Sequence, residues 1–267
     1  MTTPHPRLSS GRLSEEALSI GRVLIVCVAF AAVAIPIAIS TELSQSSSPS
    51  ATVDGLAQPT RRFADFGIEK PSPEARSLAN WIADTRDNAN ADFVIGDKKF
   101  ARVFVFVPEA RLRGSAPVLL GSARGDGSVS GIGTRPIPEV RPEERTTPAG
   151  RFVAERGRNT LGEDVVWVDY DAAVSMHRVR TVNLKERRLE RLASPTVADR
   201  RISYGCINVP SAFYDSYIRP TFANHRAIVY VMPEIKSLQK VFGVYDVAAK
   251  QGVSKPQSNA LPLWRSK

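Results

Sequence analysis

The sequence predicts a mainly β fold, a β-sandwich or barrel with peripheral helices, preceded by one N-terminal transmembrane helix. Short runs rich in β-branched and aromatic residues outnumber the segments with helical periodicity, which favours strands as the main elements. Strand-like and helix-like runs do not alternate regularly, so a parallel sheet of βαβ units is not expected. One uncharged apolar run lies near the start of the 267-residue chain and predicts the membrane helix.

The apolar run extends over 17 residues, Val23 to Ile39, and would span about 25 Å as a helix. This length is close to the thickness of the hydrocarbon core of a bilayer. Arg7, Arg12 and Arg22 precede the run, and no Lys or Arg follows it before Arg61. The positive charge next to the run is therefore confined to its N-terminal side.

Positive charges that flank a membrane helix stay on its cytoplasmic side. We therefore expect residues 1–22 in the cytoplasm, an anchor at residues 23–40 in the cell inner membrane, and the bulk of the chain in the periplasm. The small residues Ala38 and Ser40 leave a second interpretation open, a cleaved signal peptide. Both interpretations export the main domain.

The composition limits the classes of partner. A formal charge of +9 favours anionic partners. Aromatic residues make up 7% of the chain, and no helix-turn-helix, zinc pattern or aromatic-interleaved basic stripe occurs, so nucleic acid is not an expected partner. Of the two cysteines, Cys27 lies in the apolar run, so it is not expected to pair with Cys206. No metal or organic cofactor is implied.

The segments before the main domain have distinct patterns. Residues 41–71 open with a stretch rich in Ser, Thr and Ala, which predicts a flexible linker. Segment 72–97 begins with Ser72 as a helix cap and Pro73 in the first turn. Apolar residues at helical spacing then predict a helix over 73–88, and we expect it to pack against the edge of the domain.

The main domain is expected over residues 98–233. Five runs in it have the composition of strands: residues 100–107, 117–122, 165–169, 172–177 and 226–232. Five glycines between residues 121 and 133 predict tight turns, but the lysine and spacing of a phosphate-binding loop are missing. Residues 210–218 predict a short helix. The C-terminal tail, residues 234–267, contains one amphipathic stretch at 238–249.

Residues 178–201 form an Arg-rich segment with eight Lys or Arg residues against three acids. Asn183 and Glu186 have the spacing of a capping box, which predicts a short helix. One interpretation of this charge run is a solvated surface helix. The other is a lid or collar that attracts carboxylates, because the segment lies between the two candidate catalytic residues described next.

The strongest candidate for chemistry is the stretch SYGCIN at residues 203–208. Gly205 can take a positive φ, which would aim the N–H groups of Tyr204, Gly205 and Cys206 at one point, as an oxyanion requires. The thiol of Cys206 would be a nucleophile if a base lay within reach. The alternative is that Cys206 is a small buried hydrophobe, the usual role of a free cysteine.

His177 is the candidate base among three histidines. His5 precedes the apolar run, and His225 lies in a loop before the last predicted strand. His177 ends a strand-like run 29 residues before Cys206, so contact between them requires the intervening segment to fold back. A purely structural histidine remains the alternative. A zinc site would need more ligands than one Cys and one His.

Two motifs resemble the YkuD-type L,D-transpeptidase domain. TPAGRF at residues 147–152 resembles that family's TPxGxF segment. His177 followed by SYGCIN is similar to the family signature, a histidine and then [S/T]HGC-hydrophobic-N/R. The similarity extends over residues 98–233. It implies a YkuD-like β-sandwich whose cysteine attacks the amide between residues three and four of a peptidoglycan stem peptide.

By this resemblance, Cys206 is the nucleophile, His177 is the base, and the backbone N–H groups of residues 204–206 form the oxyanion hole. A thioester forms with release of D-Ala, and the amine of a second stem resolves it into a cross-link. Water would instead give an L,D-carboxypeptidase. The implied substrate-binding residues are those of the motif and of the lid: Ser203, Asn208, and Arg178, Arg180 or Arg201.

Two features depart from the family's pattern. Tyr204 stands where the family usually has a second histidine, and its phenol would alter how substrate is held. The gap between His177 and Cys206 is longer than usual, and the excess is the Arg-rich segment, which we interpret as an inserted lid. A non-catalytic cell-wall-binding domain and a cysteine hydrolase of other exported peptides remain alternatives.

Overall fold

The computed structural model describes residues 61–223 and 225–252. The predicted cytoplasmic segment, the predicted anchor at residues 23–40 and the first part of the predicted linker lie outside these residues, as does the end of the tail. In the described part of the chain, no helix combines the length and the apolar character needed to cross a bilayer.

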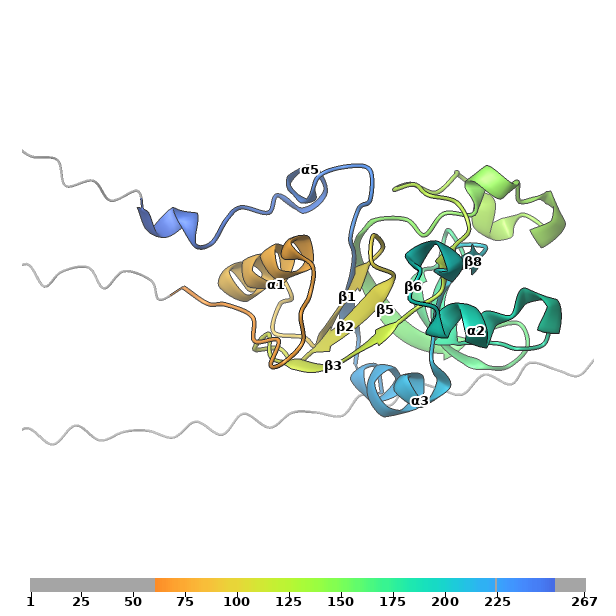
Figure 1. Ribbon diagram of the computed structural model, residues 1–267, viewed down its shortest axis with the longest axis horizontal. Coiled ribbons are helices and arrows are strands. Elements are labelled where there is room, and N and C mark those ends of the chain that lie inside the picture. Colours follow the sequence, from red (N-terminus) through yellow and green to blue (C-terminus); the bar gives the residue numbers. More distant parts are fainter. Residues whose placement is uncertain (1–60, 224, 253–267) are drawn as a thin grey trace, which may run out of the picture. The chain divides into compact units, whose positions relative to one another are not determined.

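Within the described residues, eight strands form one large sheet and two more form a small one (Figure 1). In spatial order the large sheet consists of β3 (Leu112–Pro117), β2 (Arg102–Phe106), β1 (Phe93–Asp97), β10 (Ala227–Val231), β5 (Gly150–Arg158), β6 (Asp164–Asp169), β7 (Val174–Arg178) and β9 (Ile207–Val209). The small sheet pairs β4 (Leu120–Gly121) with β8 (Arg201–Ser203). In the large sheet, β1 with β10 and β7 with β9 are parallel, and the other neighbours are antiparallel.

Helices and single turns connect the strands. The α-helical segments are α1 (Pro73–Thr85), α2 (Arg188–Ala193), α3 (Ser211–Phe213), α4 (Arg219–Thr221) and α5 (Leu238–Phe242). The tighter turns are η1 (Ile132–Thr134), η2 (Ile137–Glu139), η3 (Pro142–Glu144), η4 (Leu184–Glu186), η5 (Val197–Arg200) and η7 (Ala249–Gly252), and η6 (Tyr214–Ile218) is a π-helical turn. The predicted helix over residues 210–218 corresponds to α3 and η6.

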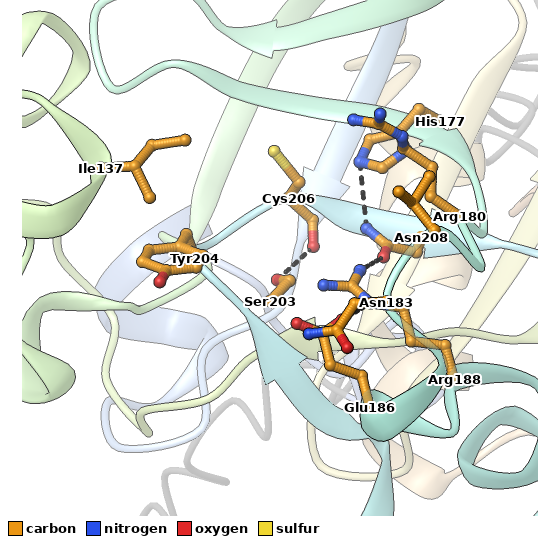
Figure 2. A pocket seen from close by; sticks show the side chains of 11 residues that line it. Ile137, His177, Arg180, Asn183, Glu186, Arg188, Ser203, Tyr204, Cys206 and Asn208 are labelled. Carbon is orange, nitrogen blue, oxygen red and sulfur yellow. Dashed lines mark hydrogen bonds and ion pairs between the residues drawn. The ribbon is translucent and has the colours of Figure 1, made fainter.

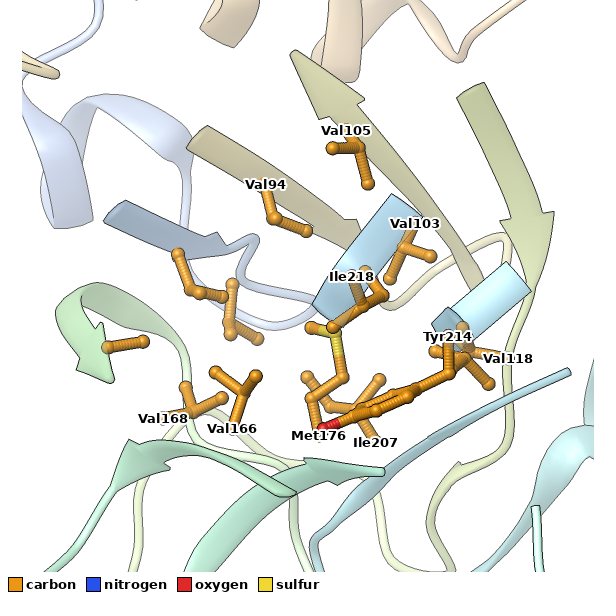
Figure 3. Packing of buried hydrophobic residues seen from close by; sticks show 14 of the residues in the cluster. Val94, Val103, Val105, Val118, Val166, Val168, Met176, Ile207, Tyr214 and Ile218 are labelled. Carbon is orange, nitrogen blue, oxygen red and sulfur yellow. The ribbon is translucent and has the colours of Figure 1, made fainter. Parts of the chain in front are cut away.

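The large sheet curls until its two ends meet, which makes it barrel-like. Leu119, just after β3 at one end, pairs with Asn208 in β9 at the other end through two backbone hydrogen bonds of 2.9 Å. Val103 of β2 and Ile207 of β9 belong to one buried cluster although their strands lie near opposite ends of the order (Figure 3). The prediction of a mainly β domain with peripheral helices is confirmed.

α1 covers the other face of the sheet, over β1 and β2 (Figure 1). The side chain of Ser72 accepts the N–H of Ala75 and caps the start of the helix. Leu78 and Ile82 are fully buried in one cluster with Tyr230 and neighbouring aromatic residues. Burying each of these aliphatic side chains stabilises the fold by about 1.5–3 kcal/mol.

Segment 72–97 differs from its prediction in two respects. α1 ends at Thr85 and not at residue 88, because Arg86 has a left-handed backbone with φ of 56°. The helix packs on a face of the sheet and not at an edge of the domain. The same segment also contains β1, a short and fully buried strand that lies between β2 and β10. The domain therefore begins before residue 98.

Residues 61–71, predicted as the end of a flexible linker, are part of the domain. The side chain of Phe66 is 3% exposed and lies edge-on to two rings of β2. Its ring centroid is 5.6 Å from that of Phe104 and 5.2 Å from that of Phe106. Aromatic pairs in this geometry each contribute about 0.5–1.5 kcal/mol beyond their buried area.

Asp84 of α1 holds both ends of the described chain. Its carboxylate pairs with Arg61 at 2.8 Å, and the hydroxyl of Tyr245 donates to it at 2.6 Å. The start of the tail therefore packs on the domain, and α5 forms within the amphipathic stretch predicted at residues 238–249.

A buried lysine joins three segments that are distant in the sequence. The side chain of Lys98 is fully buried and donates to Asp126 at 3.0 Å and to the carbonyl of Thr147 at 2.8 Å. Asp126 also accepts the backbone N–H groups of residues 234–236 at 2.7 to 3.0 Å. This cluster, which we call the Lys98 cluster, fixes Thr147 beside the candidate site described below.

The Lys98 cluster lowers the pKa of Asp126. Burial acts to raise this pKa, but the three backbone N–H groups and Lys98 outweigh it and bring the pKa to about 2. A carboxyl group whose pKa is lower in the folded chain stabilises the fold above the unfolded-state value, about 4, and loses that contribution as the pH falls toward the folded-state value. The full difference corresponds to about 2.5 kcal/mol.

We therefore expect the free energy of unfolding to fall more steeply with acid in the wild type than in Asp126→Asn. Between about pH 5 and about pH 2.5 the excess loss should be about 1.5 kcal/mol, measured by urea denaturation of both proteins. Equal losses in the two proteins would contradict the assignment of a lowered pKa to Asp126.

Candidate active site

Two neighbouring strands place the candidate catalytic residues on one face of the sheet. The parallel pairing of β7 with β9 sets His177 opposite Asn208. Side chains alternate between the two faces of a strand, so Ser175 and Cys206 lie on the same face as this pair, and the residues between them enter the core. The fold thus brings together two residues that lie 29 positions apart in the sequence.

His177 and Cys206 line one pocket of about 340 Å³ (Figure 2). Its walls come from the SYGCIN stretch, from the loop that holds Ile137, and from the Arg-rich segment 178–201. The Arg-rich segment supplies Arg180, Val182, Asn183, Glu186 and Arg188. It folds as η4, α2 and η5 and forms one wall of the pocket.

The Cys206 thiol lies in a polar setting. Ser175 Oγ is 3.6 Å and the Ala173 carbonyl oxygen 3.7 Å from its sulfur. Burial acts to raise the pKa of the thiol, but a protonated His177, by its charge and by donating toward the thiolate, outweighs burial together with contacts from Ser175 and lowers the pKa below its ordinary value. A lower pKa increases the fraction of thiolate, which is the nucleophilic form.

The loop before Cys206 requires a glycine and is fixed on both sides. Gly205 has a φ of +135°, and a Cβ there would lie 2.8 Å from the carbonyl oxygen of Thr146. The hydroxyl of Thr147 donates to the Gly205 carbonyl at 2.8 Å. Ser203 Oγ donates to the Cys206 carbonyl at 2.7 Å and accepts the N–H of Gly205 at 3.1 Å.

These bonds change the expected set of oxyanion donors. The N–H of Gly205 is engaged by Ser203, so it is not aimed at a ligand. In a trans peptide the N–H points opposite to the carbonyl, so the N–H of Cys206 points away from Thr147, which holds the Gly205 carbonyl. Tyr204 and Cys206 therefore remain the candidate donors of the predicted three.

Both ring nitrogens of His177 have partners. Nδ1 lies 2.8 Å from the carbonyl oxygen of Arg178, and Nε2 lies 3.1 Å from the side-chain nitrogen of Asn208. A carbonyl can only accept, so Nδ1 carries the proton, and the Asn208 amide donates to an unprotonated Nε2. Nε2 is then the basic nitrogen, and Figure 2 shows it on the side of the ring that faces Cys206.

Two arginines predicted to bind substrate are engaged elsewhere. Arg178 pairs with Asp164 at 2.8 Å and with Asp215 at 2.6 Å, and it does not line the Cys206 pocket. Arg201 pairs with Glu234 at 2.6 Å and is also absent from the pocket lining. Both arginines hold distant segments of the domain together, so the structure gives neither of them a place at the substrate.

The pocket contains the other predicted residues and one that sequence reasoning missed. Ser203 and Asn208 line it, and both side chains are hydrogen-bonded within the protein. Arg180 lines it as well, as one of the arginines considered for the lid. Arg188 was not predicted, since a charge run does not show which of its side chains turns inward.

Tyr204 lies at the rim of the pocket. Its side chain is 42% exposed, and the guanidinium of Arg145 lies 4.2 Å from the ring centroid. The phenol is thus available to a ligand from one side. Within residues 61–223 and 225–252, no group of three or more His, Cys, Asp or Glu side chains is arranged to hold a metal ion.

Part of the chain is similar to parts of solved structures. The L,D-transpeptidase from Mycobacterium smegmatis is 14% identical with a TM-score of 0.32, and the match covers 53% of this chain and 58% of that one. The helical cell shape determining protein from Campylobacter jejuni is 13% identical with a TM-score of 0.36, covering 59% and 55%. The catalytic domain of the E. faecium L,D-transpeptidase is 14% identical with a TM-score of 0.29, covering 54% and 98%.

This chain therefore spans less than two thirds of the length of the first two of these proteins. No family model matches the sequence, and no curated protein matches it either. At these identities and TM-scores, the comparisons assign no activity to the pocket.

Proposed function

We propose that this protein is a YkuD-type L,D-transpeptidase, a cysteine acyltransferase that cross-links the stem peptides of peptidoglycan. The observation that supports the proposal is the pairing, in one pocket, of the Cys206 thiol with His177, whose unprotonated Nε2 is the basic nitrogen. With it we propose residues 1–22 in the cytoplasm, an inner-membrane anchor at 23–40, and a periplasmic catalytic domain.

The first half-reaction forms a thioester. Nε2 of His177 takes the proton of the Cys206 thiol, and the sulfur bonds to the carbonyl carbon of the stem amide. The oxyanion accepts the N–H groups of Tyr204 and Cys206, each worth about 3 kcal/mol in the transition state. When the intermediate collapses, the C–N bond breaks and the imidazolium gives its proton to the departing D-Ala amine.

The second half-reaction depends on the acceptor. The amine of a second stem attacks the thioester carbonyl, His177 takes a proton from it, and Cys206 leaves as a thiolate that is reprotonated. The product is a cross-link between two stems. If water attacks instead, the same residues act as an L,D-carboxypeptidase and release the shortened stem.

Arg180 is the arginine we propose for a carboxylate of the stem. It lines the Cys206 pocket, and its Nε is buried without a hydrogen-bond partner among the described residues. The same Nε forms an ion pair of 3.5 Å with Glu163, at a distance longer than a good hydrogen bond. A substrate carboxylate would share this guanidinium with Glu163 and supply the hydrogen-bond acceptor that Nε lacks.

The proposal is tested by incubating the full-length protein with a disaccharide-tetrapeptide from peptidoglycan and identifying the products by mass. We expect release of D-Ala together with a cross-linked dimer. D-Ala release with only a shortened monomer would assign the carboxypeptidase activity. An unchanged substrate that nevertheless binds the protein would favour the non-catalytic wall-binding domain.

A further inference from the structure

A chain of hydrogen bonds connects the Arg-rich segment to the candidate base. Arg188, the first residue of α2, donates through Nη1 to Oδ1 of Asn208. The side-chain nitrogen of Asn208 donates to Nε2 of His177 at 3.1 Å, and Nδ1 of His177 donates to the Arg178 carbonyl at 2.8 Å. Figure 2 shows the first two bonds in sequence along one wall of the pocket.

Arg188 sets the direction of the first two bonds in this chain. A guanidinium has donors and no acceptor, so the group that faces Arg188 is the oxygen of the Asn208 amide. The amide nitrogen then faces His177, and because it can only donate, Nε2 must be unprotonated. The Arg178 carbonyl imposes the same state from the other side of the ring.

Arg188 and Asn208 are held rigidly enough to act in this way. The side chain of Asn208 is fully buried, and β9 fixes its backbone opposite His177. The side chain of Arg188 is 14% exposed and also pairs with Glu186. A turn of the Asn208 amide would point its N–H₂ group at the guanidinium and leave both groups without an acceptor.

We propose that Arg188 and Asn208 are positioning residues that, together with the Arg178 carbonyl, select the Nδ1-protonated tautomer of His177 and so leave Nε2 with a lone pair and no proton. The inserted Arg-rich segment then determines the state of the base, in addition to forming a wall of the pocket. The catalytic meaning of this inference rests on the proposed function, whereas the tautomer itself is a property of the protein alone.

The experiment measures the tautomer by ¹⁵N NMR of the full-length protein labelled at its histidine nitrogens, at a pH where His177 is neutral. His177→Gln identifies the His177 signals. In the wild type we expect the ¹⁵N chemical shift of Nε2 to lie in the range of an unprotonated ring nitrogen. The chemical shift of Nδ1 should lie in the range of a protonated one. In Arg188→Met the two signals should move toward each other as both tautomers become populated, and Arg188→Lys should restore much of the difference.

Arg191→Met is the matched control in the same helix. The Arg191 guanidinium donates to the carbonyls of Glu186 and Asp199 and not to Asn208. The variant therefore tests the loss of an arginine that holds the segment together without bonding to Asn208. We expect its His177 signals to match those of the wild type. A second variant, Asn208→Asp, replaces the donor by a carboxylate acceptor and should add a proton at Nε2, because the Arg178 carbonyl still accepts the proton on Nδ1.

Two results would overturn the proposal. One is an Nε2 signal that is unchanged in both Arg188→Met and Asn208→Asp, and the other is an equal shift in Arg191→Met. Neither result depends on turnover, so an absence of D-Ala release would count against the proposed function while leaving the tautomer assignment intact.

Discussion

Cys206→Ser is expected to abolish covalent labelling of the protein by a carbapenem. In the wild type, the thiolate attacks the β-lactam carbonyl, a C–S bond forms, the ring C–N bond breaks, and the ring nitrogen takes a proton. Nothing leaves, so the intact mass rises by the whole mass of the drug. A serine hydroxyl at this position is far less acidic than the thiol, whose pKa is already lowered.

Cys27→Ser is the matched control, because these are the two cysteines of the chain. We expect it to acquire the same mass increase as the wild type, at the same rate. An adduct that persists in Cys206→Ser would place the nucleophile elsewhere. A wild type that is never labelled would favour the wall-binding domain over the enzyme.

His177→Gln should slow the acylation by about 10²- to 10⁴-fold near neutral pH, the usual contribution of a general base. Gln can keep a hydrogen bond to Asn208 but cannot take a proton. Since the hydrogen bond and charge of His177 lower the pKa of Cys206 against the effect of burial, the variant's thiol should ionise at a higher pH. The difference in acylation rate between the wild type and His177→Gln should therefore become smaller as the pH rises.

The measurement is the rate of Cys206 modification by iodoacetamide and by the carbapenem across a range of pH. His225→Gln is the control, because its exposed ring lies 3.9 Å from Asp92 and does not line the Cys206 pocket. We expect its profile to match the wild type. If the modification rate rises with the same pH midpoint in His177→Gln and in the wild type, His177 does not lower the pKa of the thiol.

Composition predicts two of the strands that are buried on both faces, β2 and β10, but not β1 and β9, which are also fully buried. β2 and β10 lie within the predicted runs 100–107 and 226–232, and nearly all of their residues are buried. β5 is not predicted, because Ala154 is its single buried residue and its sequence contains two glycines and three arginines. It is a strand because β10 and β6 pair with it on both sides, which is information that its own residues do not carry.

The residues of the candidate site likewise include some that the sequence predicts and others that only the fold reveals. His177 and Cys206 could be chosen because few residues of their types occur in the predicted domain, and chemistry restricts their roles. The arginines are numerous and equivalent in sequence. Arg178 is engaged by Asp164 and Arg201 by Glu234, partners 14 and 33 residues away, so only the fold shows that these two are occupied.

Because of the Lys98 cluster, the rim of the pocket and the position of the nucleophile depend on different residues. Asp126 and Thr147 are both held by Lys98, so the loop 127–146 begins and ends beside one fixed point. Ile137 in that loop contributes to the rim of the pocket, whereas Thr147 holds the peptide next to the nucleophile. The loop can therefore be lengthened, shortened or rewritten, which changes the rim of the pocket, while the sulfur keeps its place.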